Sequence, residues 1–274
     1  MTGGRFDGKV ALITGAGASI GQALAVRFAR EGATVGVHYR GNASGAEATL
    51  RTIRAAGGDG ATFEADLRTA DAARGVVDRV ADQFGRLDIL INNSGITSWG
   101  PFLDYTEAAF DDVVNTNLKG SYFASQAAAR HFIRQNSPGR IVLISSLVGV
   151  NAVPYLSAYS MTKAGLRMLA RSLGLELGRY GITVNAIGVG PTLNERNLRD
   201  DPEYAAHWGA VVPVGRAATV DDTCAAAVFL CSDEASYVNA TTLMVDGGWS
   251  AYGPTPRFDF VEQEGRVGRK LSAT

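Results

Sequence analysis

The sequence predicts an α/β protein in which a doubly wound parallel sheet of about seven strands forms a single domain. Short apolar runs such as residues 9–14, 87–92 and 139–144 are continuous, as expected for strands buried on both faces. Segments with a helical spacing of apolar residues separate these runs. The first run ends in a glycine-rich turn that opens a helix. Strands that alternate with helices in this way form a parallel sheet covered on both faces.

The expected strands follow one another with a helix or a loop between each pair. They cover residues 9–14, 34–39, 61–64, 87–92, 139–144, 182–187 and 241–245. The expected helices cover residues 19–31, 46–56, a segment ending at Phe84, 106–135 with a break near 115–117, a segment carrying Tyr159 and Lys163, and 219–231 with Thr219 as its N-cap. Ligands of such sheets bind at the carboxyl ends of the strands, where the strand order reverses.

The charge composition argues against nucleic-acid and membrane partners. The 274 residues carry a formal net charge of −1, so no basic surface for nucleic acid is expected. The first seven residues are too polar for a signal peptide. Residues 141–162 lack charged side chains, but their serines, glycine, asparagine and proline fit the hydrocarbon core of a membrane poorly. We therefore expect a cytoplasmic protein that does not span a membrane.

Cysteine and histidine spacing predicts neither a disulfide nor a metal site. Cys224 and Cys231 are seven residues apart on an expected helix, so their Cα atoms lie about 10 Å apart. That separation is too large for a disulfide. His38, His131 and His207 have no metal-ligand spacing and are expected in core or solvated roles.

The glycine-rich turn, residues 14–21, is a candidate phosphate-binding segment. It reads Thr-Gly-Ala-Gly-Ala-Ser-Ile-Gly and lies between the first strand and the first helix. Glycines in such a turn let backbone amides approach a pyrophosphate, and the N-terminus of the helix favours its negative charge.

Tyr159, Lys163 and Ser146 form a candidate catalytic group. Tyr159 and Lys163 are four residues apart on an expected helix and therefore lie on the same face. A neighbouring ammonium favours the phenolate form of a tyrosine, which makes the hydroxyl usable for proton transfer. Ser146 lies thirteen residues before Tyr159, at the end of the expected fifth strand, where its hydroxyl can face the same crevice.

Together these motifs resemble the short-chain dehydrogenase/reductase family, whose domain is of the Rossmann type. The resemblance covers roughly residues 8–248 and includes seven motifs in the family's order, ending with Val-Asp-Gly-Gly at residues 245–248. It implies a catalytic group of Asn117, Ser146, Tyr159 and Lys163. The residues that it implies for cofactor binding are Gly15, Ser19, Ile20, Gly21, Asp66, Leu67, Asn93, Gly95, Tyr159, Lys163, Gly190 and Thr192.

The resemblance also implies a mechanism with a nicotinamide cofactor. Ser146 is expected to bind the substrate oxygen, and Tyr159 to give or take the hydroxyl proton as a hydride moves to or from the adjacent carbon. Lys163 is expected to bind the nicotinamide ribose and to favour the phenolate of Tyr159. Asn117 is expected to support a water that links Lys163 to solvent.

Several positions depart from the family pattern. Ser19 replaces the middle glycine of the turn, Ser94 replaces an alanine, and Val189 replaces a proline. Asn194 stands where a threonine often holds the cofactor carboxamide, and Thr192 is the alternative for that contact.

The second strand predicts a preference for NADP, with dual use of NAD left open. Relatives that prefer NAD tend to carry an aspartate at this strand end, which binds the ribose 2′-hydroxyl. Here the strand ends in His38-Tyr39-Arg40, and Arg40 can offer a planar donor fork to a 2′-phosphate. The alternative is that Arg40 is a solvated residue.

The predicted activity is hydride transfer between NAD(P) and a small carbonyl or secondary alcohol substrate. The pattern is similar to that of 3-oxoacyl-thioester reductases and of sugar or polyol dehydrogenases. A reductase of carrier-protein thioesters therefore stays an alternative, although Ser137 and Tyr180 occupy places where such enzymes often have basic residues. A redox sensor without chemistry is a second alternative.

The substrate side and the assembly are predicted only in outline. Trp99, Phe102, Tyr155 and Trp208 follow strand ends, where they can line a substrate pocket or simply pack. We interpret the polar run 194–201 as a lid.

A homotetramer is expected, as is common in the family. Residues 1–249 are expected to form the domain, and the tail 250–274 to dock on a neighbouring subunit, because its Phe258 and Phe260 gain free energy only on burial.

Overall fold

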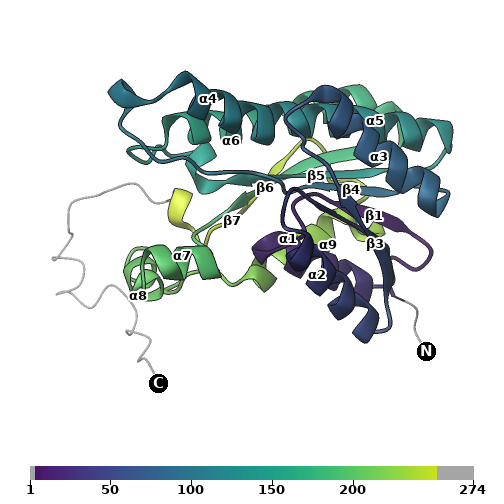
Figure 1. Ribbon diagram of the computed structural model, residues 1–274, viewed down its shortest axis with the longest axis horizontal. Coiled ribbons are helices and arrows are strands. Elements are labelled where there is room, and N and C mark those ends of the chain that lie inside the picture. The colour runs from purple at the N-terminus through teal and green to yellow at the C-terminus, as the bar shows by residue number, and fades with distance from the viewer. Residues whose placement is uncertain (1–3, 252–274) are drawn as a thin grey trace, which may run out of the picture.

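The computed structural model of the chain describes residues 4–251, which form three layers with a parallel sheet in the middle (Figure 1). The strand order is β3-β2-β1-β4-β5-β6-β7, and all neighbouring strands are parallel. The strands are β1 (Val10–Ile13), β2 (Thr34–Tyr39), β3 (Asp59–Glu64), β4 (Ile89–Asn92), β5 (Arg140–Ser146), β6 (Thr183–Val189) and β7 (Thr242–Val245). The predicted doubly wound sheet of seven strands is therefore confirmed.

The order of the strands reverses between β1 and β4. The chain runs outward from β1 through β2 to β3 on one side, and then from β4 to β7 on the other. At such a reversal the helices that follow the two strands diverge to opposite faces and leave a crevice at the strand ends. The glycine-rich turn follows β1, and Asn93 follows β4, so both flank this crevice.

The helices cover the two faces of the sheet and bury two apolar cores. They are α1 (Ser19–Arg30), α2 (Ala43–Ala55), α3 (Ala70–Phe84), α4 (Glu107–Val114), α5 (Gly120–Arg134), α6 (Ser157–Leu177), α7 (Glu195–Asp200), α8 (Tyr204–Gly209) and α9 (Val220–Cys231). α1, α2 and α9 lie on one face, while α3, α5 and α6 lie on the other (Figure 1). Side chains of Phe28 and Phe132 fill these two cores and are fully buried.

The predicted break in helix 106–135 is a π-helical turn at Asn115–Lys119, between α4 and α5. A π-helical turn inserts one residue into the helical ladder, and such turns often occur at functional sites. Asn117, the expected catalytic asparagine, lies within this turn.

Several element boundaries differ from the expected ones. The second helix begins at Ala43 rather than Ala46, because the Asn42 side chain caps it by accepting a hydrogen bond from the Gly45 amide at 3.1 Å. The fifth strand continues to Ser146 and the sixth to Val189, because residues 144–146 pair with residues 187–189. The predicted cap of the last helix is confirmed, since Thr219 and Asp222 form a capping box there.

The helices of residues 4–251 include none that is long and apolar enough to cross a membrane. The predicted docking of the tail concerns residues that lie, apart from 250 and 251, outside the described part of the chain.

Candidate active site

A cleft of about 1430 Å³ lies at the carboxyl ends of the strands. It is larger than the 300–1,000 Å³ or so typical of small-molecule pockets, and so has room for a dinucleotide together with a substrate. The cleft brings together most of the residues expected in the site. These are Gly15, Ser19, Ile20, Gly21, Arg40, Asp66, Leu67, Asn93, Gly95, Ser146, Tyr159, Lys163, Gly190 and Thr192.

Backbone geometry explains two of the glycines in the turn. Gly15 adopts φ +65°, a left-handed conformation that favours glycine. A side chain at Gly21 would collide with the carbonyl oxygen of Gly15. The turn therefore needs glycine at both positions, once for its conformation and once for packing.

The N-terminus of α1 faces the cleft without a capping side chain. Ala18 occupies the N-cap position, and the first turn carries no acidic residue. The amides at the start of a helix lack intrahelical acceptors and, with the helix dipole, favour an anion. Ser19, which lines the cleft, adopts φ +53° although it is not glycine. Such a conformation costs a non-glycine residue about 1–3 kcal/mol.

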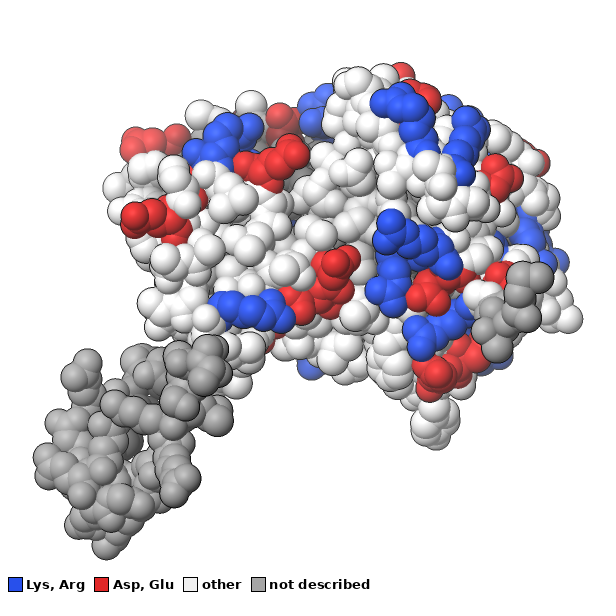
Figure 2. All heavy atoms as spheres, turned by 90° about the horizontal axis from the view of Figure 1, so that it is seen from below, with Lys and Arg blue, Asp and Glu red and all other residues white. Residues whose placement is uncertain are grey.

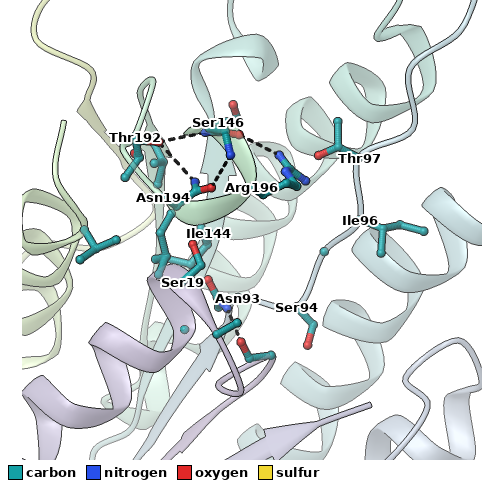
Figure 3. A pocket seen from close by; sticks show the side chains of 18 of the residues that line it. Ser19, Asn93, Ser94, Ile96, Thr97, Ile144, Ser146, Thr192, Asn194 and Arg196 are labelled. Carbon is teal, nitrogen blue, oxygen red and sulfur yellow. Dashed lines mark hydrogen bonds between the residues drawn. The ribbon is translucent and has the colours of Figure 1, made fainter. Parts of the chain in front are cut away.

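Thr14 and Asn93 join the glycine turn to the segment after β4. The Thr14 hydroxyl accepts hydrogen bonds from the amides of Asn93 and Ser94, both at 2.9 Å. The Asn93 side chain donates to the carbonyl oxygens of Thr14 and Gly15 at 2.9 and 3.2 Å. These bonds fix the two sides of the crevice relative to each other; Figure 3 shows Asn93 and Ser94 in this part of the cleft.

Ser146, Tyr159 and Lys163 all line the cleft, where α6 packs against the end of β5 and the Ser145 hydroxyl donates to the Lys163 carbonyl at 2.7 Å. Ser146 lies at the end of β5, and its hydroxyl accepts a long hydrogen bond of 3.4 Å from the amide of Val148. Tyr159 and Lys163 lie on α6, with the Lys163 ammonium 5.4 Å from the centre of the tyrosine ring. Lys163 is buried, and its ammonium donates to the Ile144 carbonyl at 2.7 Å.

Asn117 lies behind the cleft rather than in its wall. It is fully buried, and its amide oxygen accepts from the Ile96 amide at 2.8 Å. Its amide nitrogen donates to the Ile96 carbonyl at 3.0 Å and to the Thr162 hydroxyl at 3.2 Å. The side chain thus ties the segment after β4 to α6. A side-chain carbon at Gly95 would lie within 3.5 Å of both the Asn117 amide oxygen and the Lys163 ammonium, so glycine keeps this space open.

Arg40 and Asp66 lie at the adenosine end of the expected cofactor site. The carboxylate of Asp66 is engaged mainly by Arg68, at 2.7–3.1 Å, whereas Arg40 approaches it only to 3.6 Å. The hydrogen bonds from Arg68 hold the pKa of Asp66 below its usual range. Arg40 is therefore a partly exposed guanidinium in the cleft wall with one loose carboxylate partner.

Two short helices, α7 and α8, form the wall opposite the glycine turn. The Thr192 carbonyl anchors this wall by accepting from the side chains of Asn194 and Asn197 at 3.3 and 2.9 Å. Asn194 also caps α7 by accepting from the Asn197 amide at 2.9 Å. Arg196 extends from α7 beside these groups (Figure 3). Tyr204, at the start of α8, packs under this wall, where burial raises the pKa of its phenol to about 12.

Two of the four candidate aromatic residues line the cleft. Trp99 and Trp208 belong to its wall. Trp208 also packs edge to face against Trp249, with ring centroids 6.1 Å apart. Phe102 and Tyr155 lie outside the lining, and their side chains are exposed.

His38 is a site residue whose role sequence reasoning missed. It lies on β2, two residues before Arg40, and is buried against the glycine turn. Its imidazole accepts a hydrogen bond from the Gly15 amide at 3.0 Å. The available signal was a polar residue inside a buried strand at the edge of the cofactor site.

The two cysteines are core residues, as the sequence predicts. Basic and acidic side chains are interspersed on the face shown in Figure 2. Both cysteines are buried and free, and burial raises the pKa of each thiol to about 12. Among residues 4–251 no group of three or more His, Cys, Asp or Glu side chains could hold a metal ion.

Known proteins match this chain over almost its whole length. Residues 15–250 match the family described as enoyl-(acyl carrier protein) reductase. A 3β-hydroxysteroid dehydrogenase from Eggerthella lenta is 36% identical, and the match covers 93% of this chain and 97% of the relative. A 3-oxoacyl-(acyl-carrier-protein) reductase from Staphylococcus aureus is 37% identical, with 88% and 97% covered.

A solved structure with bound NADP has the same fold. It is a protein from Agrobacterium tumefaciens described as a 2-deoxy-D-gluconate 3-dehydrogenase. The two chains are 33% identical and superpose with a TM-score of 0.81, over 90% of this chain and 98% of the other.

Proposed function

We propose, for a chain that belongs to the short-chain dehydrogenase/reductase family, that Tyr159 is the acid/base of a hydride transfer between NAD(P) and a carbonyl or secondary alcohol. Family membership makes the protein an oxidoreductase that acts on CH–OH or C=O groups. The observation that carries the assignment to Tyr159 is that Tyr159 and Lys163 line the same cleft as Ser146, with the neighbouring Ser145 hydroxyl bonded to the Lys163 carbonyl at 2.7 Å.

The cleft wall suits a dinucleotide. The uncapped start of α1 offers the amides of Ser19, Ile20 and Gly21 to the pyrophosphate. Asp66 and Leu67 flank the place for the adenine, while Asn93 and Gly95 line the middle of the cleft. Gly190 and Thr192 line its far end, where we assign them to the nicotinamide side. When bound there, the nicotinamide ring supplies or accepts the hydride.

The proton moves at the Tyr159 hydroxyl. In the direction of reduction Tyr159 donates a proton to the substrate oxygen, and in the direction of oxidation its phenolate accepts one. The Ser146 hydroxyl donates a hydrogen bond to the same substrate oxygen. Lys163, whose ammonium lies 5.4 Å from the Tyr159 ring centre, is assigned to bind the cofactor ribose. We assign to Asn117 the support of a water that passes the proton between Lys163 and solvent.

The cofactor preference is proposed to be NADP. Arg40 lines the cleft at the end of β2, where relatives that prefer NAD tend to carry an aspartate. Because Arg68 already satisfies most of the Asp66 carboxylate, Arg40 can turn its donor fork to a 2′-phosphate. NAD stays a possible second cofactor, because the pyrophosphate and ribose contacts are common to both nucleotides.

Reduction of a carrier-bound 3-oxoacyl thioester is the second candidate function. Similarity to the acyl-carrier-protein reductases favours it. The places before β5 and β6 where such reductases often carry basic residues hold Ser137 and Tyr180 here, which argues for a small free substrate instead. Similarity to steroid and sugar-acid dehydrogenases points the same way.

The test is a spectrophotometric screen with both cofactors against ketones, aldoses, polyols and acyl thioesters. We expect cofactor-dependent turnover of a free carbonyl or alcohol. Turnover confined to carrier-bound thioesters would favour the second candidate. Tight cofactor binding with no turnover in the whole panel would instead indicate a redox sensor.

The assembly is proposed to be a homotetramer. Exposed apolar side chains gather on α4, α5 and α6, namely Phe110, Tyr122, Met161, Met168 and Leu175. Exposed large apolar side chains on these helices suit a surface that another subunit covers. Light scattering is expected to show a tetramer that Leu175→Glu dissociates, whereas Arg51→Glu on α2 leaves it intact. A monomeric wild type would contradict the proposal.

A further inference from the structure

His38 lies where three segments of the cofactor cleft meet. Its side chain is 1% exposed and stands at the end of β2, the strand between β1 and β3. The glycine turn follows β1, and the connection that carries Asp66 follows β3. Ser94, in the segment after β4, completes the surroundings, with its hydroxyl 3.5 Å from the imidazole Nδ1 atom.

Both ring nitrogens of His38 have backbone partners. The Gly15 amide donates to Nδ1 at 3.0 Å, and Nε2 lies 3.1 Å from the Ala65 carbonyl oxygen. The main chain of the same residue adds a third bond, because the Ala16 amide donates to the His38 carbonyl at 2.8 Å. One residue thus binds the amides of Gly15 and Ala16 and links the turn to the residue that precedes Asp66.

These partners allow a single protonation state of the imidazole. Nδ1 must be unprotonated to accept from Gly15, and Nε2 must carry the proton to donate to Ala65. A second proton on the ring would set an N–H against the Gly15 N–H. In agreement with this geometry, burial lowers the pKa of His38 to about 4.

The other side chains that hold the turn bind its carbonyl groups. Asn93 donates to Gly15, Thr49 to Ala16 and Asn42 to Gly17, at 3.2, 2.9 and 3.1 Å. Among the described residues, His38 is the side chain that accepts from an amide of this turn. The carbonyls of Gly15, Ala16 and Gly17 and the amides of Gly15 and Ala16 are therefore satisfied within the protein. The amides at the start of α1 then remain for an anion.

We propose that His38 is a positioning residue of the nucleotide site, which as a neutral imidazole fixes the glycine turn against the Ala65–Asp66 segment and so preorganises the amides of α1 for the pyrophosphate. This inference rests on the proposed binding of NAD(P) in the cleft. Because the pyrophosphate is common to both cofactors, His38 affects NAD and NADP alike, whereas Arg40 affects NADP alone.

The test uses three substitutions at His38 in the full chain. His38→Leu removes both side-chain bonds. His38→Asn keeps an acceptor near the Nδ1 position, and His38→Gln keeps a donor near the Nε2 position. The dissociation constants of NADPH and NADH are measured by cofactor fluorescence, and kcat is measured at saturating cofactor.

We expect His38→Leu to weaken both cofactors by about fivefold to tenfold, the effect of losing one ordinary hydrogen bond. The ratio of the two constants and the saturated kcat should stay within about twofold of wild type. His38→Asn should recover most of the affinity and His38→Gln should not. A purely structural role for His38 would give no such rescue by asparagine.

Unchanged affinities in a folded His38→Leu variant would overturn the inference, and so would a loss confined to NADPH. If His38→Leu does not fold, the inference is tested by comparing the cofactor affinities of His38→Asn and His38→Gln. Equal affinities of these two variants would count against the inference. Failure of the wild type to bind either cofactor would remove the proposed function itself. Normal binding by wild type with unaffected variants would remove only the role of His38.

Discussion

The two walls of the cleft are built in opposite ways. The glycine turn is held by fully buried polar side chains, since Thr14, His38 and Thr49 are each at most 1% exposed. The α7–α8 wall has no buried residue in either helix, and Arg196 and Arg199 are exposed at its surface. Both walls line one cavity.

This difference matches the proposed use of the two walls. One wall binds the cofactor, which is always the same, and the other binds the substrate, which varies among relatives. A dense set of buried hydrogen bonds fixes backbone amides in one geometry, which suits a cofactor of constant shape. Short helices with few buried contacts open and rearrange at low cost in free energy, which suits a wall that admits and selects substrates. We therefore expect substitutions in the glycine-turn wall and at the strand ends below it to affect cofactor binding and chemistry. Substitutions in α7 and α8 should affect the choice of substrate.

The largest expected effect is at Ser146, on the floor of the cleft. Ser146→Ala removes the hydroxyl proposed to bind the substrate oxygen and should lower kcat by about a hundredfold to a thousandfold, the usual effect of losing one such donor. The dissociation constant of NADPH should not change. A variant that lost cofactor affinity and kept kcat would place Ser146 in the cofactor site instead.

The next effect is a dependence of protein stability on pH, which arises from His38 beside the glycine turn. The pKa of His38 is about 4 in the folded protein, against an ordinary value of 6.5. Between these values the unfolded chain binds more protons, so the free energy of unfolding falls as the pH falls from about 6.5 to about 4. The loss amounts to about 3 kcal/mol.

Denaturant titrations of wild type and His38→Asn between pH 4 and 7 measure this contribution. Asp66 and Arg79, the charged groups that act on His38, are present in both proteins and cancel in the difference. The variant should lack the additional pH slope. Parallel curves for the two proteins would show that His38 does not titrate as its contacts require.

Arg40 tests whether the proposed cofactor-binding wall distinguishes NADP from NAD. Arg40→Ala should raise the Michaelis constant for NADP by about tenfold to a hundredfold, since a charge-assisted contact contributes about 1.5–3 kcal/mol, and should leave that for NAD little changed. Arg51→Ala on α2 is the matched control, because it removes an exposed guanidinium that lies outside the cleft lining and should leave both Michaelis constants unchanged. Equal losses for both cofactors, or a strong wild-type preference for NAD, would show that Arg40 does not recognise the phosphate.

The smallest expected effect is at Ser19, where the rigid wall holds a strained residue. Ser19 has φ +53°, a conformation that glycine adopts without a steric cost. The substitution Ser19→Gly should therefore raise the free energy of unfolding by about 1 kcal/mol. Ser19→Ala lacks the hydroxyl but keeps the strain, so it isolates the contribution of the side chain to cofactor affinity. Thermal unfolding of the three proteins measures the difference. A Ser19→Gly variant less stable than Ser19→Ala would contradict the account.

The sequence predicts the fold well because strand burial and motif order are local signals. The apolar runs specified all seven strands, and Thr14, Gly15 and Gly21 specified the turn after β1. The break near Asn117 was also visible, although its π-helical form was not.

The main site feature that the sequence did not predict, the role of His38, depends on contacts between distant segments. The hydrogen bonds of His38 to Gly15 and Ala65 span 23 and 27 residues, and no local pattern indicates them. The pair of Arg68 with Asp66 is local, but no motif indicated it. In the α7–α8 wall the exposed, weakly packed side chains leave little periodicity, so the substrate cannot be inferred from it.

The central claim is that Tyr159 transfers the proton while other residues hold the cofactor, and Tyr159→Phe tests it most directly. The substitution keeps the ring and removes only the hydroxyl. With a substrate found in the screen, kcat should fall by at least about a hundredfold, the usual contribution of general acid–base catalysis, with the NADPH dissociation constant near that of wild type. Tyr155→Phe is the matched control, since Tyr155 is exposed outside the cleft lining and should retain full turnover. Near-normal turnover in Tyr159→Phe would contradict the account.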